Sequence, residues 1–303
     1  MSTPPFKDRP QMFNRELAES VGAPQRFGKT YYVDGTNGAN SKGGRTWDEA
    51  LATVAAAVAL LASGDRIVIA PGEYDEAITI PRTLNNISLI GTGGRGAAFI
   101  APSTAAAVAV TNHADDVTID NVGLDGNTTG AGLINSGSRL RVYRSKLEGD
   151  DIACQMLVAT IAQEAADTRG TAGDILFEDC EFAWATTGLL LTGSDYGAVT
   201  QMTLRGCRFH NHSAASIEES HGAGGGNTVH YRNLVIDSCV FDDAEDGTAP
   251  TKYVSLNDDN ANSGIVANCS FPTAINSGLN LVSTALHWVS NRHTGGVSTA
   301  QPS

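Results

Sequence analysis

An eight-residue motif recurs along this chain of 303 residues. Four copies end in Cys-x-Phe: ILFEDCEF at 175–182, MTLRGCRF at 202–209, LVIDSCVF at 234–241 and GIVANCSF at 264–271. Two earlier copies, VTIDNVGL at 117–124 and LRVYRSKL at 140–147, replace the cysteine. Successive cysteine positions are separated by 23, 35, 27, 32 and 30 residues. A repeat of this length with variable insertions predicts a solenoid.

The phase of the apolar residues indicates which solenoid. The residues five and three before the cysteine are apolar, as expected for a strand with one inward face. The cysteine and the following phenylalanine are also apolar but have the opposite parity, so the backbone must bend between the two pairs. The residue before the cysteine position is mostly of a type that tolerates a left-handed bend: Asn121, Arg144, Asp179, Gly206, Ser238 and Asn268. We therefore predict an all-β chain, a right-handed parallel β-helix.

In such a coil the motif residues form a core stack. The expected members are Cys180, Cys207, Cys239, Cys269, Phe182, Phe209, Phe241 and Phe271. Stacked cysteines would be roughly 4.8 Å apart with parallel side chains, beyond the Cβ separation of about 3.5–4.5 Å that a disulfide requires. We expect reduced thiols that act as small core hydrophobes. No CxxC or CxxH spacing occurs, so we expect neither a metal site nor a cofactor.

Residues 1–28 differ from the repeats. Four prolines interrupt a polar segment that carries the apolar residues Phe6, Met12, Phe13, Leu17 and Phe27. It contains no apolar stretch of the kind found in signal peptides, and no segment of the chain is long and apolar enough to span a membrane. We interpret residues 1–28 as an arm that docks on a partner through these side chains, with a casual extension as the alternative.

The segments after residue 28 are expected to cover the open end of the coil and then to form its turns. Thr46 and Glu49 form a capping-box pattern ahead of an alanine-rich stretch, which predicts a helix over Asp48–Ala62 that covers the first turn. The resulting boundaries are an arm at 1–28, a strand and capping helix at 29–64, the β-helix at 65–275, and a last turn or C-terminal plug with a polar tail at 276–303. The net charge of −13 argues against nucleic acid as a partner.

The sequence also resembles a known superfamily. YYVDG at 31–35, the alanine-rich stretch, GDRIVIAPGEY at 64–74 and ISLIG at 87–91 are similar to the N-terminal half of the pectate-lyase-like superfamily. That superfamily includes pectate lyases, polygalacturonases and bacteriophage tailspikes. The resemblance covers residues 30 to about 275, and its motifs are architectural, so it implies the fold and leaves the function to the site residues.

Carbohydrate-active enzymes of this fold use carboxylates on the coil surface. We single out as catalytic candidates Glu218, Glu219, Asp258, Asp259, Asp150 and Asp151. Glu148, Glu178, Glu181, Asp242 and Asp243 belong to similar acidic groups. None stands in a motif of pectate lyases or polygalacturonases, so solvated turns are the favoured interpretation. His210 and His212 resemble the His-x-His metal site of some phage spike tips, but we expect an ordinary exposed turn there.

Three functional classes follow. The first is a bacteriophage virion protein, a head decoration protein or head fibre, made in the host cytoplasm and attached by its arm. It is expected to be a homotrimer that contacts other virion proteins through residues 1–28 and that can bind host-surface polysaccharide. The second is a tailspike depolymerase, a glycoside hydrolase or polysaccharide lyase. The third is a cellular carbohydrate-active enzyme. The sequence favours the first, without enzymatic activity.

Overall fold

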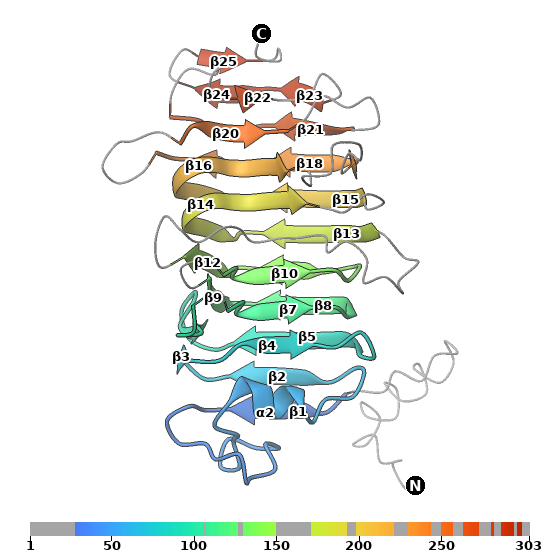
Figure 1. The fold of residues 1–303 in the computed structure, drawn as a ribbon, viewed down its shortest axis with the longest axis vertical. Helices are drawn as coiled ribbons and strands as arrows, with labels where there is room; N and C mark the ends of the chain where they lie inside the picture. Colours follow the sequence, from blue (N-terminus) through green and yellow to red (C-terminus); the bar gives the residue numbers. More distant parts are fainter. Residues whose placement is uncertain are drawn as a thin grey trace, which may run out of the picture.

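The protein forms a rod of stacked turns in the computed structural model (Figure 1). The structure describes residues 28–105, 107–126, 130–149, 171–192, 198–220, 230–243, 250–256, 263–272, 280–281, 286–293 and 296–298. Strand β1 (Thr30–Val33) lies at one end and β25 (Gly296–Ser298) at the other. Within the coil each turn pairs in parallel with the next. The predicted all-β, right-handed parallel β-helix is confirmed.

Parallel sheets run along the rod. Among the described residues, the longest has 11 strands. They are β1, β2 (Arg66–Ile69), β5 (Asn85–Gly91), β8 (Asp115–Asp120), β11 (Arg141–Tyr143), β13 (Thr171–Glu178), β15 (Ala198–Arg205), β17 (His230–Arg232), β18 (Leu234–Asp237), β21 (Gly264–Ala267) and β23 (Leu286–Val289). The first half of each repeat of the motif lies in this sheet.

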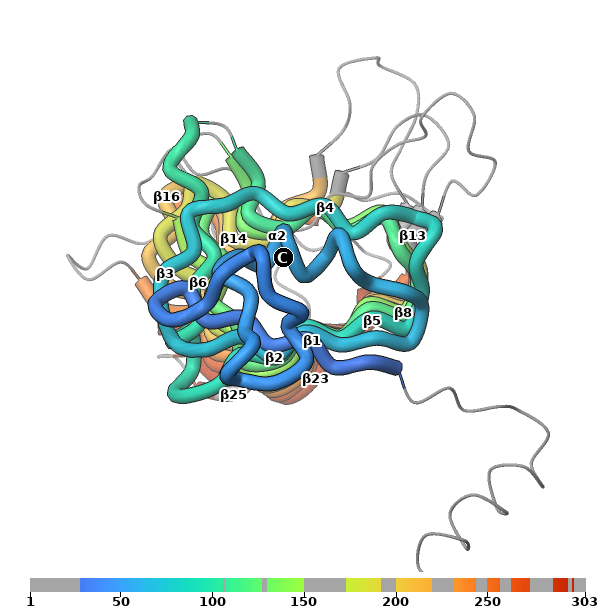
Figure 2. Tube along the Cα trace, turned by 90° about the horizontal axis from the view of Figure 1, so that it is seen from below, coloured from blue at the N-terminus to red at the C-terminus, as the bar shows by residue number. Residues whose placement is uncertain are grey.

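The second half of the motif lies in another sheet. Its strands are β3 (Gly72–Tyr74), β6 (Ala98–Ile100), β9 (Val122–Gly126), β12 (Lys146–Gly149), β14 (Glu181–Thr192), β16 (Arg208–Ser220), β19 (Val240–Phe241), β20 (Lys252–Ser255) and β22 (Asn280–Leu281). A shorter sheet holds β4 (Ile78–Ile80), β7 (Val110–Asn112) and β10 (Leu133–Asn135), and β24 (Asn291–His293) pairs with β25 in an antiparallel hairpin. Seen along the rod, the sheets lie on different sides of a common interior (Figure 2).

The corner between the two long sheets has the left-handed backbone that the motif predicts. Asn121, Arg144, Asp179, Gly206, Ser238 and Asn268 all have φ between 46° and 61°. A second series of left-handed residues, which sequence reasoning missed, lies within or just before strands of the longest sheet. It comprises Asn86, Asp116, Arg139, Asp174, Gln201 and Asn233. Two regular bends per turn therefore set the cross-section of the coil.

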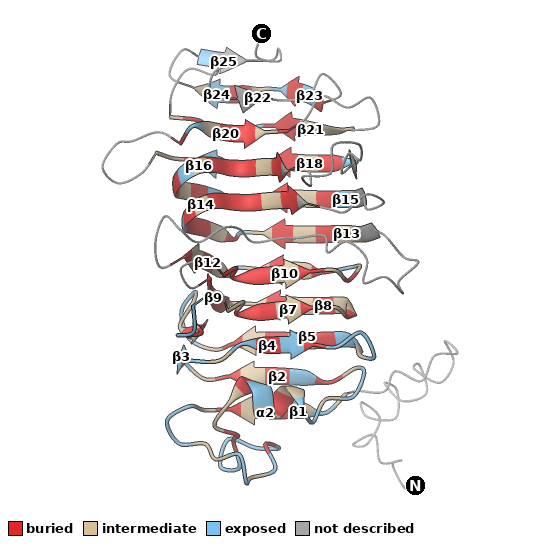
Figure 3. Cartoon of the chain, in the orientation of Figure 1, coloured by how far each residue is buried: buried red, intermediate tan, exposed pale blue. Residues whose placement is uncertain are grey.

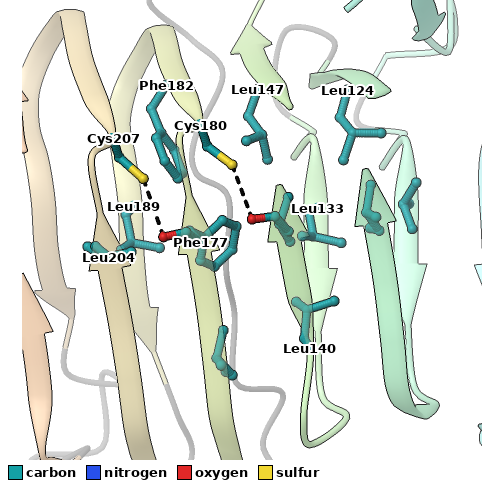
Figure 4. Close-up of a cluster of buried hydrophobic side chains, with 14 of the residues drawn as sticks. Leu124, Leu133, Leu140, Leu147, Phe177, Cys180, Phe182, Leu189, Leu204 and Cys207 are labelled. Carbon is teal, nitrogen blue, oxygen red and sulfur yellow. Dashed lines mark hydrogen bonds between the residues drawn. The ribbon is translucent and has the colours of Figure 1, made fainter. Parts of the chain in front are cut away.

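The interior is filled by the inward residues of successive turns, so buried and more exposed positions alternate along many of the strands (Figure 3). Phe182, Phe209, Phe241 and Phe271 are buried and their rings stack turn upon turn. The four motif cysteines are buried and free. The Cys180 Sγ–H donates to the Val142 carbonyl at 3.4 Å and Cys207 to the Phe177 carbonyl at 3.5 Å (Figure 4).

Chemical protection of these thiols is a testable consequence. Cys180, Cys207, Cys239 and Cys269 are all buried, with at most 1% of each residue exposed. Because a reagent must reach the sulfur in order to react, a thiol reagent at pH 8 should leave these four cysteines of the native protein unmodified. In denaturant without reductant, all five cysteines of the chain, Cys154 included, should react. Fewer than five reactive thiols would show a disulfide and contradict the reduced stack.

The capping helix is shorter than predicted. Helix α2 covers Val54–Val58, with Thr53 as its N-cap, instead of Asp48–Ala62. The Thr46 hydroxyl accepts from the Glu49 amide at 3.3 Å, but this bond closes a turn. Leu51 then runs extended beside β1, where its amide donates to the Tyr32 carbonyl at 2.9 Å and its side chain is buried. Pairing with the end strand overrides the helix propensity of this stretch.

Candidate functional site

The acidic candidates do not form an accessible catalytic pair where the structure describes them. Glu218 of β16 accepts a hydrogen bond from the Thr187 hydroxyl at 2.9 Å. Glu219 is 7% exposed and pairs in register with the buried Leu191 of the preceding turn. Glu218 and Glu219 are therefore adjacent in sequence but lie in different environments, one hydrogen-bonded and the other buried. Asp150, Asp151, Asp258 and Asp259 lie outside the described residues, as do Phe6, Met12, Phe13, Leu17 and Phe27.

Acidic and basic side chains on the coil surface pair between adjacent turns. The pairs are Asp116–Arg139, Asp174–Arg141, Asp120–Arg144, Glu178–Arg205, Glu181–His210 and Asp242–Arg208. The hydrogen bond and charge of Arg139 lower the pKa of Asp116, although burial opposes part of this effect. Exposed pairs of this kind contribute only about 0–1 kcal/mol each. Their main consequence is that these carboxylates are held in fixed orientations by the turns beside them.

His210 and His212 lie in strand β16, so the predicted exposed turn is wrong. The left-handed Asn211 between them sends the two rings to different environments. The His210 Nε2 lies 3.0 Å from Glu181, whereas His212 is 2% exposed and its Nδ1 lies 3.3 Å from the Ser216 hydroxyl. Ser216 is fully buried, so this serine and histidine cannot reach a substrate. The two rings also do not share a face as a His-x-His metal site requires.

A glycine makes room for the His212 ring. A Cβ placed on Gly188 of the preceding turn would lie 2.6–2.7 Å from the ring atoms, which real side chains do not tolerate. Burial, with a smaller contribution from the charge of His210, lowers the pKa of His212 to about 3. His212 is therefore neutral at physiological pH and packs as part of the structure.

Trp184 is a residue that sequence reasoning missed. It follows Phe182 by two residues, at a position where simple alternation along β14 would point it inward. Its φ of 58° departs from the strand, and the residue is 41% exposed. The available signal was weak: Trp184 is one of only three tryptophans in the chain and stands two residues after the last residue of a Cys-x-Phe motif.

An apolar groove lies at the N-terminal end of the rod. Its volume is about 380 Å³, and helix α2 and the segment around β4 form its walls. Ala55, Val58, Leu61, Ile78 and Leu84 contribute to the lining. The chain enters the coil at the same end of the rod, where the Lys29 amide donates to the Asp65 carboxylate at 2.6 Å.

The described residues contain no group of three or more His, Cys, Asp or Glu side chains that could hold a metal ion. Within the same ranges, no helix has the length and apolar character needed to cross a membrane.

Comparison with solved structures places the fold among known proteins. A pectin methylesterase from Aspergillus niger has a TM-score of 0.56 and 16% identity, over 93% of this chain and 90% of that one. Pectin methylesterase PemA from Erwinia chrysanthemi has a TM-score of 0.53 and 16% identity, over 90% and 91%. The carrot enzyme has a TM-score of 0.52 and 15% identity, over 88% and 84%.

These likenesses establish the fold. The parallel β-helix expected from the resemblance to the pectate-lyase-like superfamily is thus shared with the pectin methylesterases. At this level of identity the likeness does not extend to activity. No family model matches the sequence, and no curated protein is significantly similar to it.

Proposed function

We propose that this protein is a structural component of a bacteriophage particle, a β-helical head decoration protein or head fibre that can bind host-surface polysaccharide. One observation carries the proposal. Residues 1–27 precede a coil that begins at one extreme end of a rod, so a protein anchored through them projects the rest of its length outward. The proposal includes a homotrimer, which light scattering of the purified protein would test.

The rod is suited to a projecting role. Every turn of the described coil is hydrogen-bonded to its neighbours, and the ring stack from Phe182 to Trp288 is continuous through the C-terminal half. Each repeat contacts its neighbours through the same dense core, so the described turns form one continuous stack. The charged pairs connect adjacent turns on the surface.

The engaged carboxylates favour binding over hydrolysis. A glycosidase requires two carboxylates that face the scissile bond, one as an acid and the other as a base or nucleophile. In the described part, Glu218 is hydrogen-bonded, Glu219 is buried, Glu181 lies 3.0 Å from the His210 ring, and Asp242 is paired with Arg208. The alternative is a tailspike depolymerase. The shared fold is compatible with it, since one matching pectin methylesterase was solved in complex with a hexasaccharide, but that neighbour is named as an esterase and not as an enzyme that cleaves the sugar chain.

Loss of the arm should abolish attachment and leave the coil folded. Replacing Phe6, Met12, Phe13, Leu17 and Phe27 together by serine is expected to lower the copies per particle about tenfold or more, since one buried aromatic anchor often contributes about 2 kcal/mol. Quantitative mass spectrometry of purified particles would measure this. The control is a replacement of Asn14, Glu16 and Glu19 by serine in the same segment. Normal incorporation of the apolar-to-serine variant would contradict the anchoring role.

A further inference from the structure

Trp184 occupies a backbone conformation that a bulky residue rarely adopts. Its φ is 58°, and 41% of the residue is exposed. A left-handed conformation is unfavourable for residues other than glycine, and Asn and Asp tolerate it best. In the next turn the left-handed residue beside Trp184 is Asn211, as the pairing of Ala183 with His210 and Ala185 with His212 shows. Tryptophan is the unusual choice at this corner.

Packing offsets only part of this strain. A large aromatic residue normally stabilises a protein by burying its ring, but 41% of Trp184 stays in contact with water. A large residue that is both strained and exposed is typical of a functional position. The strain therefore indicates that Trp184 is kept for what it contacts outside the protein.

Polar side chains in fixed orientations surround this position. Ala183, next to Trp184, pairs with His210 in the following turn and with Glu148 in the preceding one. The His210 Nε2 lies 3.0 Å from the Glu181 carboxylate, and its Nδ1 accepts a hydrogen bond from the Asn211 side-chain amide at 3.1 Å. The side chains of Glu148 and Glu181 are 21% and 24% exposed, so part of each reaches solvent.

This combination is complementary to a sugar. A pyranose ring has an apolar C–H face that stacks on an aromatic ring and a rim of hydroxyl groups that hydrogen-bond to carboxylates, imidazoles and amides. We propose that Trp184 is the stacking platform of a glycan-binding subsite, with the carboxylates of Glu148 and Glu181 as hydrogen-bonding partners of the sugar hydroxyls. The assignment rests on the glycan-binding part of the proposed function and names its location on the rod.

The charge of the surroundings selects the class of glycan. Glu148 is ion-paired with Lys146 and Glu181 is bonded to His210, so the charged groups beside the platform already have partners. The net charge of −13 on the chain as a whole disfavours the approach of uronic and sialic acid residues. The ligand is therefore a neutral oligosaccharide. A protein partner is less well matched, because protein interfaces have an extended apolar centre and Trp184 stands among polar side chains.

A printed array of neutral gluco-, galacto- and manno-oligosaccharides tests the subsite. The wild type should bind at least one glycan, and Trp184→Asn should lower that binding about tenfold or more. Trp184→Tyr should retain part of the binding, because a smaller platform remains. Trp47→Ala, which removes another exposed tryptophan far from this corner, should bind like the wild type.

The unfolding midpoint of Trp184→Asn should equal or exceed that of the wild type, because asparagine tolerates the conformation.

The outcomes separate the subsite from the wider proposal. If Trp184→Asn binds the same glycan as strongly as the wild type, the assignment of the subsite to Trp184 is wrong, and the protein binds glycan at another place. If the wild type binds no glycan on the array, both the subsite and the glycan-binding function are wrong. If Trp184→Asn changes the oligomeric state in light scattering, Trp184 is a contact between copies of the chain and the subsite is again overturned.

Discussion

Replacing Phe209 by alanine should destabilise the protein by about 3–5 kcal/mol. Phe209 is fully buried, and its ring stacks on Phe182 at 4.5 Å and on Phe241 at 5.1 Å, with interplanar angles of 11° and 9°. Alanine would leave a cavity between two rings held in place by strand pairing. Because the strands cannot close the gap, most of the lost contact energy appears as lost stability.

Urea unfolding followed by circular dichroism measures this effect. The matched control is Val240→Ala, one turn further along the same sheet, where the side chain is 39% exposed and the expected change is below about 0.5 kcal/mol. The slope of the transition should be the same in both variants, so that the midpoints report stability alone. If the Phe209→Ala protein were as stable as the Val240→Ala protein, the stacked rings would not contribute the expected free energy of unfolding.

Acidification should destabilise the protein well above the range in which its carboxylates titrate. The pKa of His212 is about 3 in the folded protein, against about 6.5 for an unperturbed histidine. Between these values the unfolded chain binds a proton that the folded chain does not, so stability falls as the pH drops. The slope is about 1.4 kcal/mol per pH unit, and the loss reaches about 3 kcal/mol near pH 4.

The contribution of His212 to the pH dependence of stability can be separated from that of the carboxylates. Asp116 has a lowered pKa, so its stabilisation is present above about pH 4 and is lost only below that value. Unfolding free energies of the wild type and of His212→Asn, measured at half-unit steps from pH 7 to pH 4, would isolate His212. The variant should show a flatter dependence by about 1 kcal/mol per pH unit. Equal slopes would mean that His212 is accessible to protons in the folded state.

Much of the fold could be predicted because every copy of the motif contains the residues that determine where the backbone bends. The inward pairs of the motif and the small or polar residue before each cysteine determine a bend at one place in every turn, and the left-handed φ of Asp179, Gly206 and Ser238 confirms it. The helix was predicted too long because a capping box is a local signal. Pairing of Leu51 with β1 is a tertiary contact that no local pattern reports.

The candidate site could not be predicted from the same rules. The acidic residues look alike in sequence, and only the stacking of turns shows that Glu181 meets His210 while Asp242 meets Arg208. His212 looked exposed because it follows the motif, but the space above Gly188 in the neighbouring turn buries it. Trp184 was missed because alternation places it inward and the positive φ that reverses its direction is invisible in the sequence.

Electron cryomicroscopy of phage particles that incorporate this protein tests the proposed anchoring most directly. We expect a rod attached at the β1 end, with residues 1–27 in contact with a particle protein and the later turns, Trp184 included, facing outward. Contact with the capsid lattice would identify a decoration protein or head fibre, and contact with the tail would identify a tailspike. A rod attached along its side or by its β25 end, with residues 1–27 free of any neighbour, would contradict anchoring through residues 1–27.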